Sequence, residues 1–93
     1  GLLLTRMPSP IVALNRAVAV AMRDGPEAGL QALEPLMEDD ALRDYHLAHA
    51  ARADLHRRLG QREPAIAAYQ AALECDPQPA EQRFLRQRLA ELA

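Results

Sequence analysis

Tryptophan and lysine are absent from this 93-residue sequence, and aromatic residues make up only 3% of it. A β-sandwich favours β-branched and aromatic side chains in its core, so the scarcity of rings argues against that fold. No stretch of the chain approaches the roughly 18 consecutive apolar residues of a membrane-spanning helix. The first residues also lack the basic region and the small-residue cleavage site of a secretory signal peptide. We therefore expect neither a sheet-based core nor a membrane association.

Cysteine occurs once, at Cys75, so no disulfide can form within the chain, and we predict a reducing, cytoplasmic location. The net charge is −2, and this balance provides no general positive field for a nucleic acid. Arginines do cluster, but acids are interspersed among them and no aromatic side chains interleave them. We therefore expect no direct contact between this domain and nucleic acid.

Alanine and leucine dominate the sequence instead, and glycine and proline divide them into five runs that we predict to be helices. Their expected ranges are 10–23, 26–38, 41–60, 63–74 and 79–92. Ser9 and Pro10 fit the N-cap and the first position of the first helix, and Pro35 should kink or shorten the second. Because the connections are only a few residues long, neighbouring helices must pack antiparallel.

The glycines Gly25 and Gly60 are separated by nearly the period of about 34 residues that characterises tetratricopeptide repeats. If Gly60 is the bend of a hairpin, five further residues match this repeat: Ala53, Ala65, Tyr69, Ala72 and Pro77. Small side chains allow two helix backbones to approach closely, and the Tyr69 ring would fill the space toward the next hairpin. The earlier unit matches less well, because Ala28 and Ala32 take the corresponding places in its second helix two residues early.

We predict an all-α fold made of antiparallel helical hairpins, in a tetratricopeptide-like right-handed array with a C-terminal capping helix. A degenerate repeat is expected at about 10–40, a clearer repeat at about 41–77, and the capping helix at about 79–92. The apolar stripe of that last helix would consist of Phe84, Leu85, Leu89 and Leu92. Such arrays generally need about three units for stability. The N-terminal end also lacks the polar surface of a terminal capping repeat, because Leu2–Leu4 is apolar. We therefore expect a fragment of a longer chain, with a neighbour upstream or a homodimer through this N-terminal end.

Three histidines, His46, His49 and His56, lie on one side of the predicted third helix, where such a stripe could bind a metal. Their spacing differs from the i, i+4 pair of the zinc metalloprotease motif, and two of them occupy packing positions of the repeat. We therefore favour a packing or hydrogen-bonding role for them. A small metal-dependent enzyme is the more remote alternative, and we expect neither a metal nor a cofactor.

No other group of residues in the sequence predicts catalysis. Cys75 is near the end of a predicted helix, where the negative end of the helix dipole raises a thiol pKa. The acids of Glu38–Asp40 fit helix capping, and Asp54 is placed to pair with the arginines around it, Arg52, Arg57 and Arg58. Ser9 is the only serine, and its spacing supports no serine–histidine–acid set. We therefore predict a domain that is not an enzyme and has no catalytic residues.

The remaining functional feature is the concave face of the predicted array. In helical repeats of this kind the first helix of each hairpin lines the concave face, where peptides dock. The predicted protein-interaction face consists of Asn15, Met22, Leu47, Asp54, Arg57 and Arg58, with Val12, Ala19 and Ala50 beside them. The alternative is that these positions contact a neighbouring domain of the same protein.

Four stretches of the sequence resemble a known protein family: "SPIVALNRAVAVA", "GPEAGL", "YHLAHAARADLHRRLG" and "PAEQRFLRQRLAEL". They are similar to the C-terminal extension of extracytoplasmic-function (ECF) RNA polymerase sigma factors that carry a tetratricopeptide-like tail. The resemblance extends from Leu2 to Leu92, and its strongest stretch includes Ser9, Asn15 and Arg16. It implies that promoter-reading sigma domains precede this domain in the full protein and recruit RNA polymerase.

By this resemblance the domain would be a protein-interaction and regulatory part of a bacterial ECF sigma factor that modulates transcription initiation. Its expected partners are the upstream sigma domains of the same chain, and RNA polymerase or a regulatory protein. Asn15 and Arg16 could serve the structure or the binding of a partner. The alternative, from a different class, is a free-standing tetratricopeptide adaptor that binds peptide segments and has no part in transcription.

Overall fold

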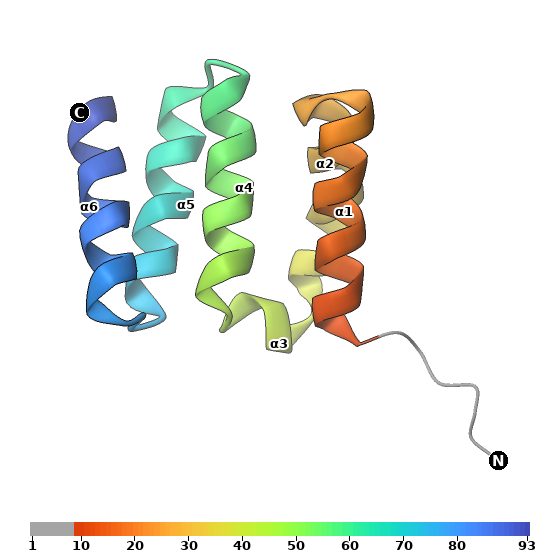
Figure 1. Ribbon diagram of the computed structural model, residues 1–93, viewed down its shortest axis with the longest axis horizontal. Helices are drawn as coiled ribbons and strands as arrows, with labels where there is room; N and C mark the ends of the chain where they lie inside the picture. Colours follow the sequence, from red (N-terminus) through yellow and green to blue (C-terminus); the bar gives the residue numbers. More distant parts are fainter. Residues whose placement is uncertain (1–8) are drawn as a thin grey trace, which may run out of the picture.

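The computed structural model describes residues 9–93, and helices connected by short turns account for nearly all of them (Figure 1). The elements are α1 (Pro10–Asp24), α2 (Pro26–Leu33), the 3-10 helix η1 (Glu34–Glu38), α3 (Asp40–Arg43), α4 (His46–Arg58), α5 (Arg62–Glu74) and α6 (Pro79–Leu92). No strand occurs among these residues, so the predicted all-α class is confirmed. Leu2–Leu4 and the dimer contact predicted there lie outside the described residues.

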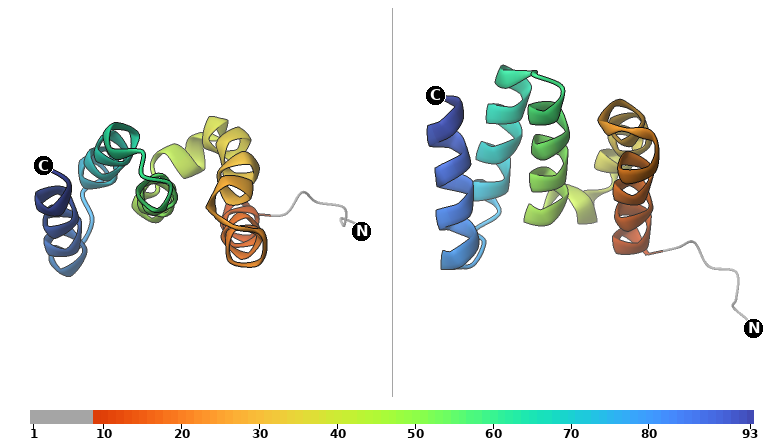
Figure 2. Two further views of the ribbon diagram at one scale, coloured as in Figure 1. Left: turned by 90° about the horizontal axis from the view of Figure 1, so that it is seen from above. Right: turned by 45° about the horizontal axis from the view of Figure 1, so that its top comes forward.

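The helices form two antiparallel hairpins and a final single helix. α1 packs against α2, α4 packs against α5, and α6 packs on α5 (Figure 1). Seen from above, α1, α4 and α6 lie on one side of the molecule, whereas α2 and α5 lie on the other (Figure 2). None of the helices within residues 9–93 combines the length and the apolar character needed to cross a bilayer.

Local signals set the start of α1 and the form of the segment after α2. The Oγ atom of Ser9 accepts a hydrogen bond from the Val12 backbone N–H at 3.2 Å, and Pro10 occupies the first helical turn, as predicted. Pro35 has no N–H to donate to the preceding turn, so the α-helix cannot continue regularly through it. The chain tightens there into η1, which confirms that Pro35 shortens the second helix.

The predicted continuous helix at 41–60 is wrong, because the chain breaks between α3 and α4. Tyr45 has an extended backbone, with φ −106° and ψ 111°, and separates the short α3 from α4. The break allows Leu42, which is 1% exposed, to enter the core formed by the first hairpin, and Tyr45 packs against the same core. Burial of apolar side chains therefore overrides the helical propensity of this segment.

Gly60 forms the bend of the second hairpin, as predicted. Its φ is 75°, a left-handed conformation that glycine adopts without strain. The Gly60 N–H donates to the Arg57 carbonyl at 3.0 Å, and the Gln61 N–H donates to the His56 carbonyl at 2.9 Å. This pair of bonds is the Schellman arrangement, which closes the C-terminus of α4 before the chain reverses into α5.

Two hydrophobic cores share α4. The buried residues of the first core are Leu14, Ala17, Ala21, Leu30, Leu33, Met37, Leu42, Ala48 and Leu55. Those of the second core are Ala53, Ala65, Ala68, Tyr69, Ala72 and Leu85. The second core therefore contains the small residues and the ring that the repeat pattern selected. Pro77 is also buried, and its carbonyl accepts a hydrogen bond from Gln82 Nε2 at 2.8 Å.

The first hairpin differs from the repeat alignment in where its helices touch. Gly29 is buried, and a Cβ atom added to it would lie 2.3 Å from the Cβ of Ala21. Ala28 and Ala32, which the alignment placed at the packing positions, are only half-buried. The tight contact between α1 and α2 is therefore made at Gly29, which lies between the two alanines that the repeat alignment selected.

The apolar stripe of α6 is narrower than predicted. Leu85 is fully buried, and Leu89 and Leu92 pack against the second core. Phe84, however, is 44% exposed, and the Arg88 guanidinium carbon lies 5.2 Å from the centre of its ring. Phe84 therefore lies at the exposed edge of the predicted stripe, where its ring makes a cation–π contact with Arg88.

Candidate protein-interaction site

A pocket of about 260 Å³ lies between α1 and α4, which belong to different hairpins. Its lining comes from both helices and consists of Val18, Ala21, Met22, Ala51, Asp54, Leu55 and Arg58. Both helices lie on the same side of the molecule (Figure 2), and α4 packs more extensively on α2 than on α1. The space between α1 and α4 is therefore left as a hollow with aliphatic walls and a charged rim.

The charged rim is held together by Asp54. Its Oδ1 atom accepts a hydrogen bond from Arg57 Nη2 at 2.6 Å, and its Oδ2 atom lies 2.9 Å from Arg58 Nε. These pairs confirm the predicted ion pairing along the helix for two of the three neighbouring arginines. Arg52 pairs elsewhere, because its Nε atom donates to Glu34 Oε2 at 3.2 Å and so connects α4 to η1.

Arg57 does not line the pocket, and its guanidinium lies near Tyr69 of α5. The hydrogen bond to Asp54 is the largest cause that raises the pKa of Arg57, and the hydroxyl of Tyr69 on α5 is the second. That hydroxyl is buried and lies beside the guanidinium without reaching a normal hydrogen-bond geometry. Arg57 therefore holds the Asp54 carboxylate in place through their ion pair, from outside the pocket lining.

The pocket brings together three of the six residues predicted for the interaction face: Met22, Asp54 and Arg58. Met22 is 80% exposed and Arg58 has a side chain that is 55% exposed, so both are accessible at the rim. Asn15 and Leu47 are exposed near the other end of α1 and α4, and they do not line the pocket. Three of the six predicted residues therefore line this pocket, and Asn15, Leu47 and Arg57 do not.

Four lining residues were missing from the predicted face: Val18, Ala21, Ala51 and Leu55. Helical spacing could have identified them in the sequence. Val18 and Met22 are one turn apart, and Ala51, Leu55 and Arg58 are likewise spaced by three or four residues on one helix face. Ala21 and Leu55 also belong to the first core, and an apolar residue in a helix reads first as a core residue. The pocket wall is in fact the edge of that core.

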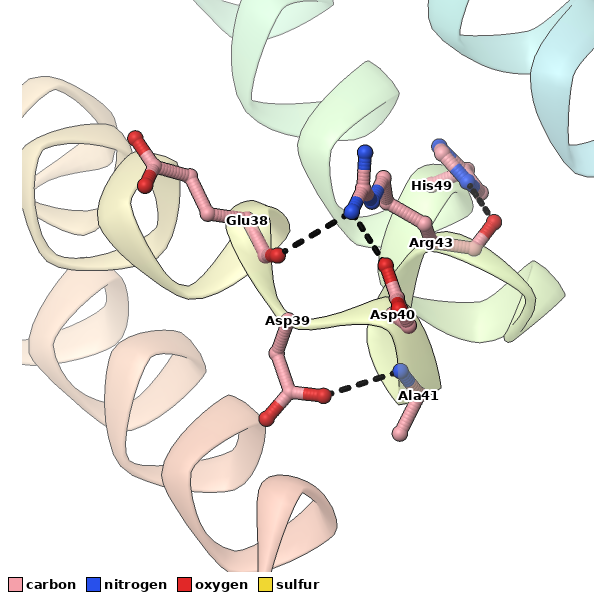
Figure 3. A network of polar contacts seen from close by, with 6 residues as sticks. All are labelled: Glu38, Asp39, Asp40, Ala41, Arg43 and His49. Atoms are coloured by element: carbon pink, nitrogen blue, oxygen red, sulfur yellow. Dashed lines mark hydrogen bonds and ion pairs between the residues drawn. The ribbon is translucent and has the colours of Figure 1, made fainter.

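A second pocket, of about 540 Å³, lies where the α3–α4 break meets the end of α5. It is lined by Arg43, Asp44, His49, Ala71, Glu74 and Cys75. His49 Nε2 donates a hydrogen bond to the Arg43 carbonyl at 2.7 Å (Figure 3). Cys75 Sγ lies 3.7 Å from the same oxygen. The histidine therefore satisfies a carbonyl that the break in the helix leaves free.

The pKa of the Cys75 thiol is raised, as predicted, although the main cause differs from the one expected. Burial is the largest cause, followed by the negative charges of Asp44 and Glu74. A raised thiol pKa means less thiolate at neutral pH, and the thiolate is the reactive form. Cys75 therefore has the properties of a packed thiol and not of a nucleophile.

The acidic run before α4 acts in helix capping, as predicted. Asp39 Oδ1 accepts a hydrogen bond from the Ala41 backbone N–H at 2.8 Å and so caps α3 (Figure 3). Arg43 pairs with Asp40, and its Nη2 atom donates to the Glu38 carbonyl at 3.3 Å. These contacts fix the turn between η1 and α4.

The three histidines have separate structural partners. The His46 ring stands edge-on to Tyr45, with 5.7 Å between the ring centres, and His49 bonds to the Arg43 carbonyl. His56 Nδ1 lies 2.7 Å from Gln61 Oε1, across the Gly60 bend. Among residues 9–93, no three histidine, cysteine, aspartate or glutamate side chains are grouped so that they could hold a metal ion.

Comparison with known proteins finds similarity to part of a longer protein. No family model matches the chain, and no solved structure matches it. Over 86 residues, or 92% of its length, the chain is 42% identical to "Uncharacterized protein R00370" of Rhizobium meliloti (strain 1021). The chain spans only 20% of the length of that relative.

Proposed function

We propose that this domain is a protein-interaction module that contacts a partner through the pocket between α1 and α4. The observation that carries this proposal is the pocket itself, which combines aliphatic walls with the charged rim of Asp54 and Arg58. Surfaces of this composition suit protein segments, since apolar side chains supply affinity and charged groups supply specificity. Met22, at 80% exposure, is an aliphatic side chain left without a cover at the edge of the pocket.

We further propose that the helices are a short right-handed, tetratricopeptide-like array. Three features support this: the buried alanines and Tyr69 of the second hairpin, the bend at Gly60, and the placement of α1, α4 and α6 on one side (Figure 2). In such an array α6 would be the C-terminal cap, and α1 and α4 would be the helices that present the binding face.

The parent protein of this domain is, in our proposal, a cytoplasmic ECF sigma factor in which the domain modulates transcription initiation. The support is the similarity of the four sequence stretches quoted above, together with a relative about five times as long, since the chain spans 20% of it. The expected contacts are with the upstream sigma domains, RNA polymerase or a regulatory protein.

The test compares promoter transcription by the full-length protein with transcription by a version that ends before Ser9. A second version replaces Met22 and Arg58 by Asp and Glu, which alters the pocket rim and leaves both cores intact. Both changes should alter the output of a dependent promoter, whereas the exposed control substitution Arg86→Glu on α6 should not. Unchanged transcription after removal of the domain would overturn the proposal, as would a parent sequence with further helical repeats in place of sigma domains.

A further inference from the structure

The size of the α1–α4 pocket limits what can occupy it. At about 260 Å³ it is smaller than the roughly 300–1,000 Å³ typical of sites for small organic ligands. Ala51 and Arg58 mark its ends on α4, and at about 1.5 Å of rise per residue they are on the order of 10 Å apart. An extended peptide covers that distance in about three residues. The pocket is therefore suited to one aliphatic side chain and its immediate neighbours.

The charge at the rim determines which neighbours fit. Both carboxylate oxygens of Asp54 are already engaged, one by Arg57 and one by Arg58. Two guanidinium groups thus face one carboxylate, and a positive charge remains in excess. At the end of α1, Arg23 and Asp24 pair with each other at 3.0 Å and add no further excess.

Arg58 is the group that carries this excess charge toward the pocket. Its Nε atom faces Asp54, which orients the guanidinium, and more than half of the side chain is exposed. An oriented guanidinium forms its strongest hydrogen bonds with a carboxylate. The Arg58 guanidinium can therefore donate hydrogen bonds to an acidic side chain of a ligand. The Asp54 carboxylate is already paired with two arginines and is not free to bind a basic side chain.

We propose that the pocket binds a short acidic segment of a partner protein, in which one leucine-like side chain enters the hollow and an adjacent Asp or Glu side chain bonds to Arg58. This inference rests on the proposed interaction function and specifies its ligand. The aliphatic anchor would lie among Val18, Met22 and Leu55, and the carboxylate would complete the charge balance that Asp54 leaves open.

A peptide titration of the 93-residue chain, followed by nitrogen-15 NMR, tests the proposal. The probe is the tripeptide Asp-Leu-Asp, acetylated and amidated so that only its side chains carry charge. We expect saturable shifts of the Met22, Ala51 and Arg58 amides at probe concentrations up to about 10 mM, since one anchor and one charged bond give only weak affinity. Asn-Leu-Asn and Asp-Ser-Asp should each bind several-fold more weakly, about fivefold or more.

Variants of two exposed arginines separate the role of Arg58 from general charge effects. Arg58→Met should weaken binding of Asp-Leu-Asp about fivefold or more, whereas Arg86→Met on α6 removes the same charge outside the pocket and should leave binding unchanged. Arg58→Glu should reverse the preference, so that Lys-Leu-Lys binds better than Asp-Leu-Asp. This reversal keeps the test independent of any small loss of stability in a single variant.

Four results would overturn the inference: no saturable shift with Asp-Leu-Asp, equal binding of the asparagine probe, no effect of Arg58→Met, or a concentration-dependent dimer that buries Met22. The last result would identify a second copy of this chain as the occupant. The promoter-transcription experiment described above tests the proposed function independently of this peptide titration. If transcription depends on the domain while the acidic probe fails to bind, only the inference about the ligand falls.

Discussion

Gly29 faces Ala21 where α1 crosses α2, and a Cβ atom on Gly29 would lie 2.3 Å from the Cβ of Ala21 and 3.0 Å from its Cα. Because the second of these atoms is backbone, one of the helices must move to admit a methyl group. Gly29→Ala should therefore destabilise the domain by about 1–2 kcal/mol, even after the gain of about 1 kcal/mol in helix propensity. Urea denaturation followed by circular dichroism measures the free energy of unfolding.

The matched control exchanges the two residues. In the double variant Ala21→Gly, Gly29→Ala, the methyl group moves from one helix to the other and the clash disappears. We expect this variant to be more stable than the sum of its single changes predicts, by about 1 kcal/mol or more. Strictly additive effects would show that the close contact does not limit the packing of α1 on α2.

Alanine substitutions at the two bends should differ in their effect. Gly60 has φ 75°, and Gly25 has φ 103° and ψ 165°, a conformation that is essentially restricted to glycine. Neither position has an atom within 4 Å of an added Cβ, so any loss of stability comes from the backbone alone. We expect Gly60→Ala to cost about 1–2 kcal/mol and Gly25→Ala somewhat more, within about 1–3 kcal/mol.

Asparagine provides the control at Gly60, because it tolerates the left-handed conformation better than alanine does. The melting temperature of Gly60→Asn should lie between those of the original protein and Gly60→Ala. An equal loss for both variants would contradict a backbone origin of the effect.

Tyr69 should be sensitive to loss of its ring and insensitive to loss of its hydroxyl. The residue is 1% exposed in the second core, and the buried hydroxyl has no hydrogen-bond partner of normal geometry. Tyr69→Ala should therefore cost about 3–5 kcal/mol, a large part of the roughly 5–15 kcal/mol that stabilises a typical domain. Tyr69→Phe should change the free energy of unfolding by less than about 0.5 kcal/mol. A loss of about 1.5 kcal/mol or more in the phenylalanine variant would show that the hydroxyl bonds to Arg57 in solution.

The pH dependence of alkylation tests the environment of Cys75. Burial, Asp44 and Glu74 all raise the pKa of the thiol, so the folded chain has less thiolate than the unfolded chain at any given pH. The rate of reaction with iodoacetamide should therefore rise at higher pH in the folded protein than in urea. Asp44→Asn and Glu74→Gln should each lower the midpoint only in part, because burial is the largest cause. A folded-state midpoint at or below that of the unfolded chain would contradict the raised pKa.

Much of the fold was predictable because local chemistry sets most of the element boundaries. Ser9, Pro10, Pro35 and Gly60 each act through their own backbone or their nearest neighbours, and the structure uses each of them as predicted. The break at Tyr45 was not predictable in this way. It depends on the burial of Leu42 in a core built by a different hairpin, which no local pattern reports.

The lining of the α1–α4 pocket was predictable only in part, because it depends on the rotation of α4 relative to its neighbours. Arg57 and Arg58 are adjacent in the sequence, yet one turns toward Tyr69 and the other lines the pocket. One residue along a helix is a rotation of about 100°, and a repeat alignment does not fix the rotation that closely. For the same reason Phe84 was placed on the same apolar stripe as Leu85, although Phe84 is 44% exposed and Leu85 is buried.

The sharing of α4 between the two cores has a thermodynamic consequence. This helix supplies Ala48 and Leu55 to the first core and Ala53 to the second, so displacement of α4 disrupts the packing of both cores. A molecule that binds only the folded chain stabilises it by mass action. If that molecule binds against α4, it stabilises the one helix that both cores need. Saturation of the α1–α4 pocket by a ligand would then slow amide hydrogen exchange even in α6, at the opposite end of the domain.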